Sequence, residues 1–139
     1  MAESLPEPIP ESLFVYGSLR RHGSHPNAAR LAAEARWLGN ARLRGHLHDA
    51  GGYPGLIVDA RGELIEGDLY ALHDPPRTLA WLDHYEECSP AFPAPREYQR
   101  VNQTVLVEPD RRPIQAWVYV YRWPSATLPR WHGPDATAQ

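Results

Sequence analysis

Phe14-Val15-Tyr16-Gly17-Ser18-Leu19 is the stretch around which the chain is organised. Residues 13–16 are apolar and β-prone, which predicts a short buried strand. The strand stops at Gly17, where the lack of a Cβ lets the backbone turn sharply or approach a ligand closely. Backbone N–H groups in such a turn can converge on an anion such as a carboxylate. An ordinary strand end is the alternative, and these residues alone leave both open.

The composition restricts the class of protein. A length of 139 residues fits one domain with a single hydrophobic core. The net charge of −3 provides no basic surface for nucleic acid, and no apolar run reaches the roughly 18 residues of a membrane-spanning helix. One cysteine allows no internal disulfide, and the N-terminus lacks the features of a signal peptide. We therefore expect a cytoplasmic monomer or small homo-oligomer, with neither nucleic-acid nor membrane partners.

The chain is predicted to have three parts. Residues 1–12 are acidic and rich in proline, which predicts a flexible lead-in. Residues 13–123 contain the strand and helix patterns and form the predicted domain. Residues 124–139 are a proline-rich polar tail, whose Trp131 is a candidate to pack back on the domain.

Strands outnumber helices in the predicted domain. Helices are expected at 27–37 and from Pro75 to about Glu87, the second with Asp74 as its N-cap. Strands are expected at 39–47, 56–58, 64–72, 98–107 and 114–123, with turns at 49–55, 60–63 and 108–112 and a loop at 88–96. The turn at 60–63 is predicted to close a hairpin, and Gly67 indicates a bulge or close backbone approach. Because strands and helices do not alternate, the order favours an α+β domain with a curved, mostly antiparallel sheet or small barrel.

A carboxylate lies on the apolar face of the second predicted helix. At about 100° per residue, Glu86 falls between Leu79 and Leu82, whereas Glu87 falls on the polar side. In a structural interpretation, Glu86 bends to water or pairs with an arginine such as Arg96 or Arg100. In a functional interpretation, it faces a pocket, where desolvation raises its pKa and makes it a usable general base.

Three other signals are weak. His46 and His48 share a face of a predicted strand, but no third ligand with metal-site spacing follows, so we predict neither metal nor cofactor. Arg20-Arg21 is expected to be a solvated pair, with attraction of an anionic substrate as the alternative. Cys88 is expected to be an ordinary loop thiol.

Six short motifs occur in order along the predicted domain. They are Tyr16-Gly17-Ser18-Leu19, Tyr53-Pro54-Gly55, Glu66-Gly67-Asp68-Leu69-Tyr70, Leu82-Asp83-His84-Tyr85-Glu86, Tyr98-Gln99-Arg100 and Ala116-Trp117-Val118-Tyr119. Each is weak alone, but together they resemble the γ-glutamylcyclotransferase-like family, also called the AIG2-like family. The resemblance covers most of residues 13–123 and is nearest to the γ-glutamylamine cyclotransferases. The chain departs from many members by having Glu87 where they have glycine, which leaves the choice of substrate open.

The resemblance implies a fold and a site. The fold is a small mixed, mostly antiparallel β-barrel with flanking helices. Glu86 is implied to be the catalytic residue, and the loop of Tyr16, Gly17, Ser18 and Leu19 to hold the α-carboxylate of the substrate through backbone amides. Backbone N–H groups near Tyr53 and Pro54 are candidates to steady an oxyanion. Tyr119 is a candidate to reach the pocket from the last strand, with a cross-strand aromatic contact as the alternative.

The implied reaction converts a γ-glutamyl amine or γ-glutamyl amino acid to 5-oxoproline and a free amine, without a cofactor. The α-amino group of the substrate attacks its own γ-carbonyl, so one carboxylate can take a proton from the attacking amine and return it to the leaving amine. A non-catalytic module that binds small molecules in the same pocket is one alternative. An enzyme that removes a γ-glutamyl group from a larger metabolite is another.

Overall fold

A computed structural model describes residues 11–86, 97–122, 124–125 and 127–131. Their helices and strands are β1 (Ser12–Val15), α1 (Pro26–Glu34), β2 (Ala35–Asp49), β3 (Pro54–Val58), β4 (Glu63–Leu72), α2 (Pro75–Tyr85), β5 (Tyr98–Val107) and β6 (Arg112–Tyr121). No helix in these ranges is both long and apolar enough to cross a membrane. The predicted lead-in lies mostly outside the described residues, as do the loop at 88–96, Cys88 and Glu87.

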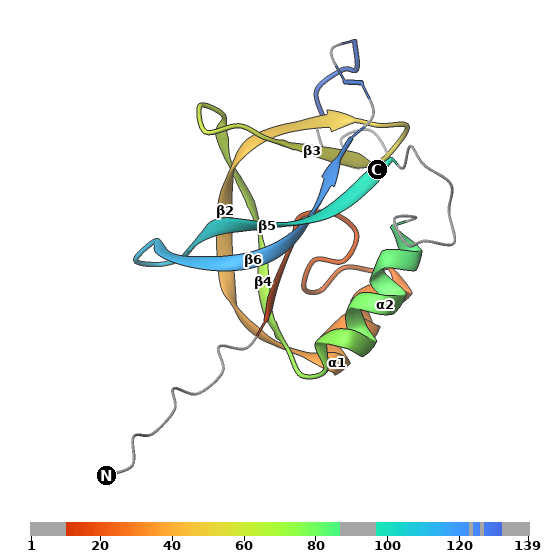
Figure 1. The fold of residues 1–139 in the computed structure, drawn as a ribbon, viewed down its shortest axis with the longest axis vertical. Coiled ribbons are helices and arrows are strands. Elements are labelled where there is room, and N and C mark those ends of the chain that lie inside the picture. Colours follow the sequence, from red (N-terminus) through yellow and green to blue (C-terminus); the bar gives the residue numbers. More distant parts are fainter. Residues whose placement is uncertain (1–10, 87–96, 123, 126, 132–139) are drawn as a thin grey trace.

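The strands form a small mixed barrel (Figure 1). Their order is β3-β2-β4-β1-β6-β5, and β2 also pairs with β5 through Ala41 with Val107 and Arg42 with Leu106. That pairing closes a ring of β2, β4, β1, β6 and β5, and β3 extends β2 as an extra strand. The β1–β6 pair is parallel and the other pairs are antiparallel. The predicted α+β class and mostly antiparallel barrel are confirmed.

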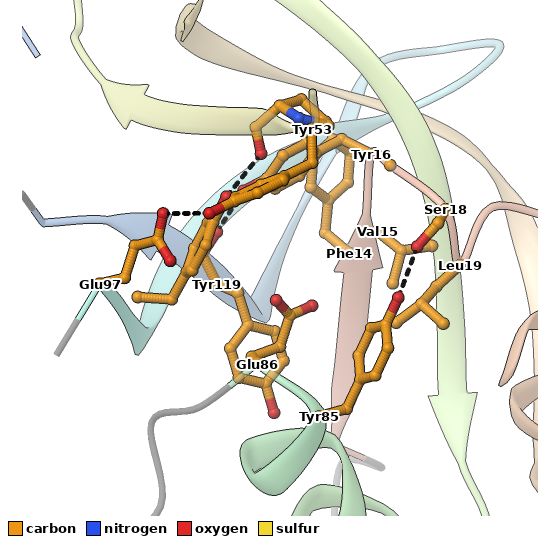
Figure 2. A pocket seen from close by; sticks show the side chains of 13 residues that line it. Phe14, Val15, Tyr16, Ser18, Leu19, Tyr53, Tyr85, Glu86, Glu97 and Tyr119 are labelled. Atoms are coloured by element: carbon orange, nitrogen blue, oxygen red, sulfur yellow. Dashed lines mark hydrogen bonds between the residues drawn. The ribbon is translucent and has the colours of Figure 1, made fainter. Parts of the chain in front are cut away.

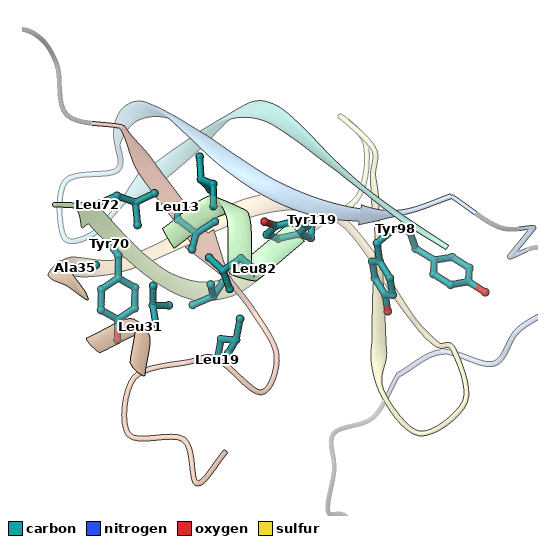
Figure 3. Packing of buried hydrophobic residues seen from close by; sticks show 12 residues of the cluster. Leu13, Leu19, Leu31, Ala35, Tyr70, Leu72, Leu82, Tyr98 and Tyr119 are labelled. Atoms are coloured by element: carbon teal, nitrogen blue, oxygen red, sulfur yellow. The ribbon is translucent and has the colours of Figure 1, made fainter. Parts of the chain in front are cut away.

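Strand β1 is buried on both of its faces, because it lies between the helices and the barrel interior. Leu13 and Val15 belong to the hydrophobic cluster that includes Leu31 of α1 and Leu82 of α2 (Figure 3). Phe14 points the other way, into the second cluster inside the barrel. The two helices contact each other through Glu34 of α1, whose carboxylate accepts hydrogen bonds from Thr78 and Trp81 of α2. The helices therefore cover one side of the barrel together (Figure 1).

The first helix is shorter than predicted. It ends at Glu34 rather than at residue 37, and β2 begins at Ala35 rather than at residue 39. Ala35 and Trp37 pair with Leu72 and Tyr70 of β4, so pairing across the sheet overrides the helical spacing of the alanines. A register shift between Trp37 and Gly39 follows, with Gly39 at a φ of 143°.

The hairpin predicted around 60–63 is wrong. Strands β3 and β4 both pair with β2, which lies between them in the sheet. The hairpin of β5 and β6 is confirmed, although β6 begins at Arg112 rather than at residue 114. The close approach predicted at Gly67 is also confirmed, since a Cβ there would lie 2.4 Å from the carbonyl oxygen of Val15.

The ends of α2 and the position of Trp131 in the tail agree closely with the predictions from the sequence. Asp74 is the N-cap of α2, and its Oδ1 accepts a hydrogen bond from the backbone N–H of Arg77 at 3.4 Å. The helix ends at Tyr85, with Glu86 as its C-cap. In the tail, the backbone N–H of Trp131 donates to the carbonyl of Leu47 at 2.9 Å, so this residue packs back on the barrel as predicted.

Candidate active site

A cavity of about 310 Å³ lies where the end of β1 faces the end of α2. Its lining residues are Phe14, Val15, Tyr16, Gly17, Ser18, Leu19, Tyr53, Pro54, Tyr85, Glu86, Glu97, Tyr98 and Tyr119. Every residue predicted for the site is in this set: Tyr16, Gly17, Ser18, Leu19, Tyr53, Pro54, Glu86 and Tyr119. Segments that are far apart in the sequence therefore meet at one hollow (Figure 2).

The carboxylate of Glu86 points into the cavity (Figure 2). The backbone N–H of Glu86 donates to the carbonyl of Leu82 at 2.8 Å, which fixes the residue at the end of α2. Within the described residues, its carboxylate has no hydrogen-bond or ion-pair partner. Burial and, to a smaller extent, the nearby carboxylates of Glu97 and Asp83 together raise the pKa of Glu86 to about 7. A group with this pKa both accepts and donates protons near neutral pH.

Arg100 pairs with the carboxylate of Asp83 and not with that of Glu86. Its Nε and Nη2 atoms donate to Asp83 at 2.8 and 3.1 Å, forming a bidentate pair. The hydroxyl of Tyr119 donates to the same carboxylate at 2.6 Å. This cluster joins α2 to β5 and β6 three residues before Glu86, so it helps to fix the end of the helix. The pairing of Glu86 with Arg100 that we considered is not observed.

The loop after β1 is packed against the beginning of β3. The Tyr16 hydroxyl donates to the carbonyl of Tyr119 at 2.6 Å and accepts from the backbone N–H of Leu56 at 3.3 Å. Burial and the charge of the Glu86 carboxylate raise the pKa of Tyr16, so the phenol stays protonated. A Cβ at Gly17 would lie 3.3 Å from the Cγ of Pro54, so glycine allows the loop and the proline ring to approach closely.

Ser18 faces Tyr85 across the cavity, with 2.9 Å between the two hydroxyl oxygens (Figure 2). Among the described residues, no acceptor contacts the backbone N–H groups of Gly17, Ser18 and Leu19. These three consecutive residues all line this end of the cavity.

Five lining residues were not predicted for the site: Phe14, Val15, Tyr85, Glu97 and Tyr98. Tyr53 donates its hydroxyl hydrogen bond to Glu97 at 2.5 Å, and Tyr98 donates to the carbonyl of Pro54 at 2.9 Å. Tyr85 and Tyr98 stand within the recognised motifs, which was the available signal. Glu97 borders a proline-rich segment without periodicity, so nothing in the sequence indicated where its side chain points.

The two arginines after the loop differ from each other: Arg21 is exposed, as expected, whereas Arg20 is half-buried and paired with carboxylates. The Nε of Arg20 pairs with Asp68 at 3.0 Å, and its Nη2 lies 3.4 Å from Glu66. The guanidinium of Arg21 lies over the ring of Trp37, with 3.9 Å to the centroid. Neither arginine lines the cavity.

The two histidines of β2 have separate partners. His46 Nε2 lies 2.8 Å from Asp59, and His48 Nδ1 lies 3.2 Å from the carbonyl of Leu128. In the part of the chain that is described, no group of three or more His, Cys, Asp or Glu side chains is arranged to hold a metal ion.

Comparison with known proteins places this barrel and cavity in a family. The family model described as "Gamma-glutamyl cyclotransferase, AIG2-like" matches residues 13–135. The chain belongs to this family. Its members are γ-glutamyl cyclotransferases, so the family implies a small γ-glutamyl molecule as substrate.

Two relatives match this AIG2-like chain over most of its length. It is 31% identical over 128 residues to the γ-glutamylaminecyclotransferase of Bos taurus, covering 84% of this chain and 67% of the bovine one. An AIG2-like protein from Mus musculus has a crystal structure with a TM-score of 0.67 and 26% identity, covering 88% of this chain and 86% of the mouse one.

A more distant structure shares only the fold. An uncharacterized protein from Pyrococcus horikoshii has a TM-score of 0.58 at 17% identity, with 86% of each chain covered. The barrel of this AIG2-like family member is thus retained in proteins with little sequence in common.

Proposed function

We propose that this protein converts a γ-glutamyl amine or γ-glutamyl amino acid to 5-oxoproline and a free amine, with Glu86 as the general acid and base. The observation that carries the proposal is the position of Glu86, which shares one cavity with the loop after β1. Its raised pKa of about 7 suits a group that must take and return a proton near neutral pH. The family, and the name of the bovine relative, support the class of reaction.

The loop after β1 is the proposed site for the α-carboxylate of the substrate. The N–H groups of Gly17, Ser18 and Leu19 offer three donors there. Tyr16, Tyr53, Pro54 and Tyr119 form walls that position the glutamyl chain. Holding the carboxylate keeps the α-amino nitrogen close to the γ-carbonyl carbon, and such intramolecular positioning can lower a barrier by up to about 7–11 kcal/mol.

The proposed proton path involves Glu86 twice. The α-ammonium group loses a proton to the Glu86 carboxylate, and the free amine attacks the γ-carbonyl carbon, forming the new C–N bond of the five-membered ring. Backbone N–H groups near Gly17 or Pro54 are candidates to stabilise the oxyanion of the tetrahedral intermediate. Glu86 then gives its proton to the leaving nitrogen as the old C–N bond breaks. The ring nitrogen loses its second proton to the carboxylate thus freed, and that proton passes on to the released amine, which leaves as an ammonium ion. No water or external nucleophile is consumed.

A panel of γ-glutamyl amines and γ-glutamyl amino acids tests the proposal. We expect 5-oxoproline and free amine in equal amounts, measured by chromatography against reactions without protein. The α-glutamyl isomers of the same amines serve as controls, because they do not present a γ-linked leaving group. Binding of the panel without any product would support the non-catalytic alternative. Turnover of large γ-glutamyl metabolites alone would support the deprotecting enzyme.

A further inference from the structure

Asp68 is a buried carboxylate outside the cavity, with only 2% of its surface exposed. It lies on β4, in register with Val15 at the end of β1. Its Oδ2 accepts from the Nε of Arg20 at 3.0 Å and from the backbone N–H of Arg21 at 2.8 Å. Its Oδ1 accepts two bonds of 3.1 Å, from the Nε1 of Trp37 and the Nδ2 of Asn40. Four donors thus surround one carboxylate.

The two oxygens of Asp68 have different partners. Oδ1 is held by β2, which is part of the barrel wall, through Trp37 and Asn40. Oδ2 is held by the chain that follows β1, through Arg20 and Arg21. One side chain therefore ties this loop to the barrel at the two residues that directly follow residues 17–19.

The same loop is folded on itself at Arg20. The backbone N–H of Arg20 donates to the carbonyl of Gly17 at 3.1 Å, so a turn of four residues begins at the proposed carboxylate site. Fixing Arg20 and Arg21 to Asp68 therefore fixes the far end of that turn. The charged pair is also costly to disturb, because removing one partner leaves a buried charge uncompensated.

We propose that Asp68 is a positioning residue that holds the loop at 17–21 in its substrate-binding conformation. The proposal rests on the proposed function, in which this loop binds the α-carboxylate. Glu86 is carried by α2 and has no contact with Asp68 among the described residues, so the chemical step is expected to be spared. Loosening the loop should thus weaken substrate binding more than turnover.

The first variant is Asp68→Asn, which keeps the shape of the side chain but replaces one oxygen with an NH₂ group. Whichever way the amide is turned, this group faces two donors, so one pair of bonds is lost. We expect KM to rise about 10-fold or more, with kcat within about threefold of the wild-type value. A wild-type KM in a folded variant, or a fall in kcat at unchanged KM, would overturn the proposal.

Two further variants keep the test decisive. Arg20→Gln removes only the guanidinium from the Asp68 cluster and is expected to raise KM by about three- to fivefold. If Asp68→Asn does not fold, an unchanged KM in Arg20→Gln overturns the proposal instead. Glu108→Gln is the matched control, because it breaks a similar pair with the Nε of Arg42 at 2.9 Å outside the cavity, and it should leave KM unchanged.

Amide hydrogen exchange separates this proposal from the proposed function. In Asp68→Asn, or in Arg20→Gln where the first variant does not fold, exchange at residues 17–21 should become faster, while the β5–β6 hairpin keeps its wild-type rates. If the wild-type protein releases no 5-oxoproline but exchange at the loop still responds, the function fails and the positioning role stands. Unchanged loop exchange in the folded variant contradicts the positioning role, whether or not the enzyme is active.

Discussion

At the scale of the residue, Glu86 is a carboxylate in an unfavourable position for a charge. Its side chain is buried in a cavity with Glu97 and close to Asp83, and the burial and both neighbours raise its pKa. Asp83 is compensated by Arg100 and Tyr119, whereas Glu86 has no such partner among the described residues. An arrangement of this kind costs stability and is typical of groups that exchange protons during a reaction.

The first prediction concerns Glu97→Gln. Removing a negative neighbour makes the charged form of Glu86 more favourable, so the pKa of Glu86 should fall below about 7. The rising limb of kcat/KM against pH should then move to lower pH, as measured by 5-oxoproline release over pH 5 to 9. Glu63→Gln, which alters an exposed glutamate outside the cavity, should leave the limb in place. A shift to higher pH in Glu97→Gln would contradict this account of the pKa.

The second prediction concerns the hydrogen bond between Ser18 and Tyr85, whose oxygens are 2.9 Å apart. Tyr85→Phe removes it, and because one such bond contributes about 0.5–1.5 kcal/mol, KM should rise by roughly two- to tenfold. Ser18→Ala should act similarly. The double variant should be no worse than the more affected single variant, because both changes remove the same interaction. Fully additive effects would show that the two hydroxyls act separately.

At the scale of the element, the close packing of β1 against β4 requires a glycine at residue 67 of β4. A Cβ on Gly67 would lie 2.4 Å from the carbonyl oxygen of Val15 and 2.6 Å from the ring of Phe14. The third prediction is therefore that Gly67→Ala loses about 1–3 kcal/mol of stability in urea unfolding, since a backbone atom cannot move aside easily. Wild-type stability in this variant would mean that β1 and β4 separate without cost.

The helices and strands differ in how well the sequence alone predicted them. The β-rich runs of β5 and β6 with the turn between them, and the cap and periodicity of α2, are local signals, and these elements were predicted with small errors at their ends. The partners of β3 and β4 depend on pairing with β2, which local patterns do not encode. Residues 35–37 were assigned to a helix for the same reason, because their place in the sheet is set by β4.

Some residues of the candidate site could likewise be found from local sequence, and others could not. Glu86 could be found because a carboxylate on an apolar helix face is anomalous, and the loop after β1 because a glycine ends a buried strand. Glu97 could not, since its neighbour in space comes from a distant turn. Asp68 stands in a recognised motif, but its contacts with distant residues could not be predicted from it. The roles of the lining residues, the division into lead-in, domain and tail, and the oligomeric state stay predictions.

At the scale of the whole molecule, closure of the barrel creates the cavity. The pairing of β1 with β6 brings Tyr119 beside the loop after β1, and the helices that cover β1 bring Glu86 to the same place. The site is therefore formed only when the complete fold has assembled. Burying the Glu86 carboxylate in it lowers the stability of the whole domain.

The fourth prediction follows from that cost. The pKa of Glu86 is about 7 in the folded state, above the value of roughly 4.3 expected for an unfolded glutamate. The folded state thus binds more protons between these values, so stability falls as the pH rises through this interval and the full cost is present above pH 8. Glu86→Gln does not titrate, so it should be more stable than wild type by about 1–3 kcal/mol at pH 8.5, with a smaller difference at pH 4.5. If the variant and the wild type gave the same urea-unfolding curve at pH 8.5 and again at pH 4.5, burial of Glu86 would not destabilise the protein.

The most direct measurement is the rate of 5-oxoproline formation by Glu86→Gln, with Glu97→Gln as the matched variant from the same cavity. General acid–base catalysis typically contributes about 10²–10⁴-fold, so we expect a loss of that size in kcat. Binding of the substrate, measured by calorimetry, should stay within a few fold of wild type, and Glu97→Gln should keep most of its activity at its own pH optimum. Turnover by a folded Glu86→Gln variant within a few fold of wild type would contradict the central claim that this carboxylate moves the proton.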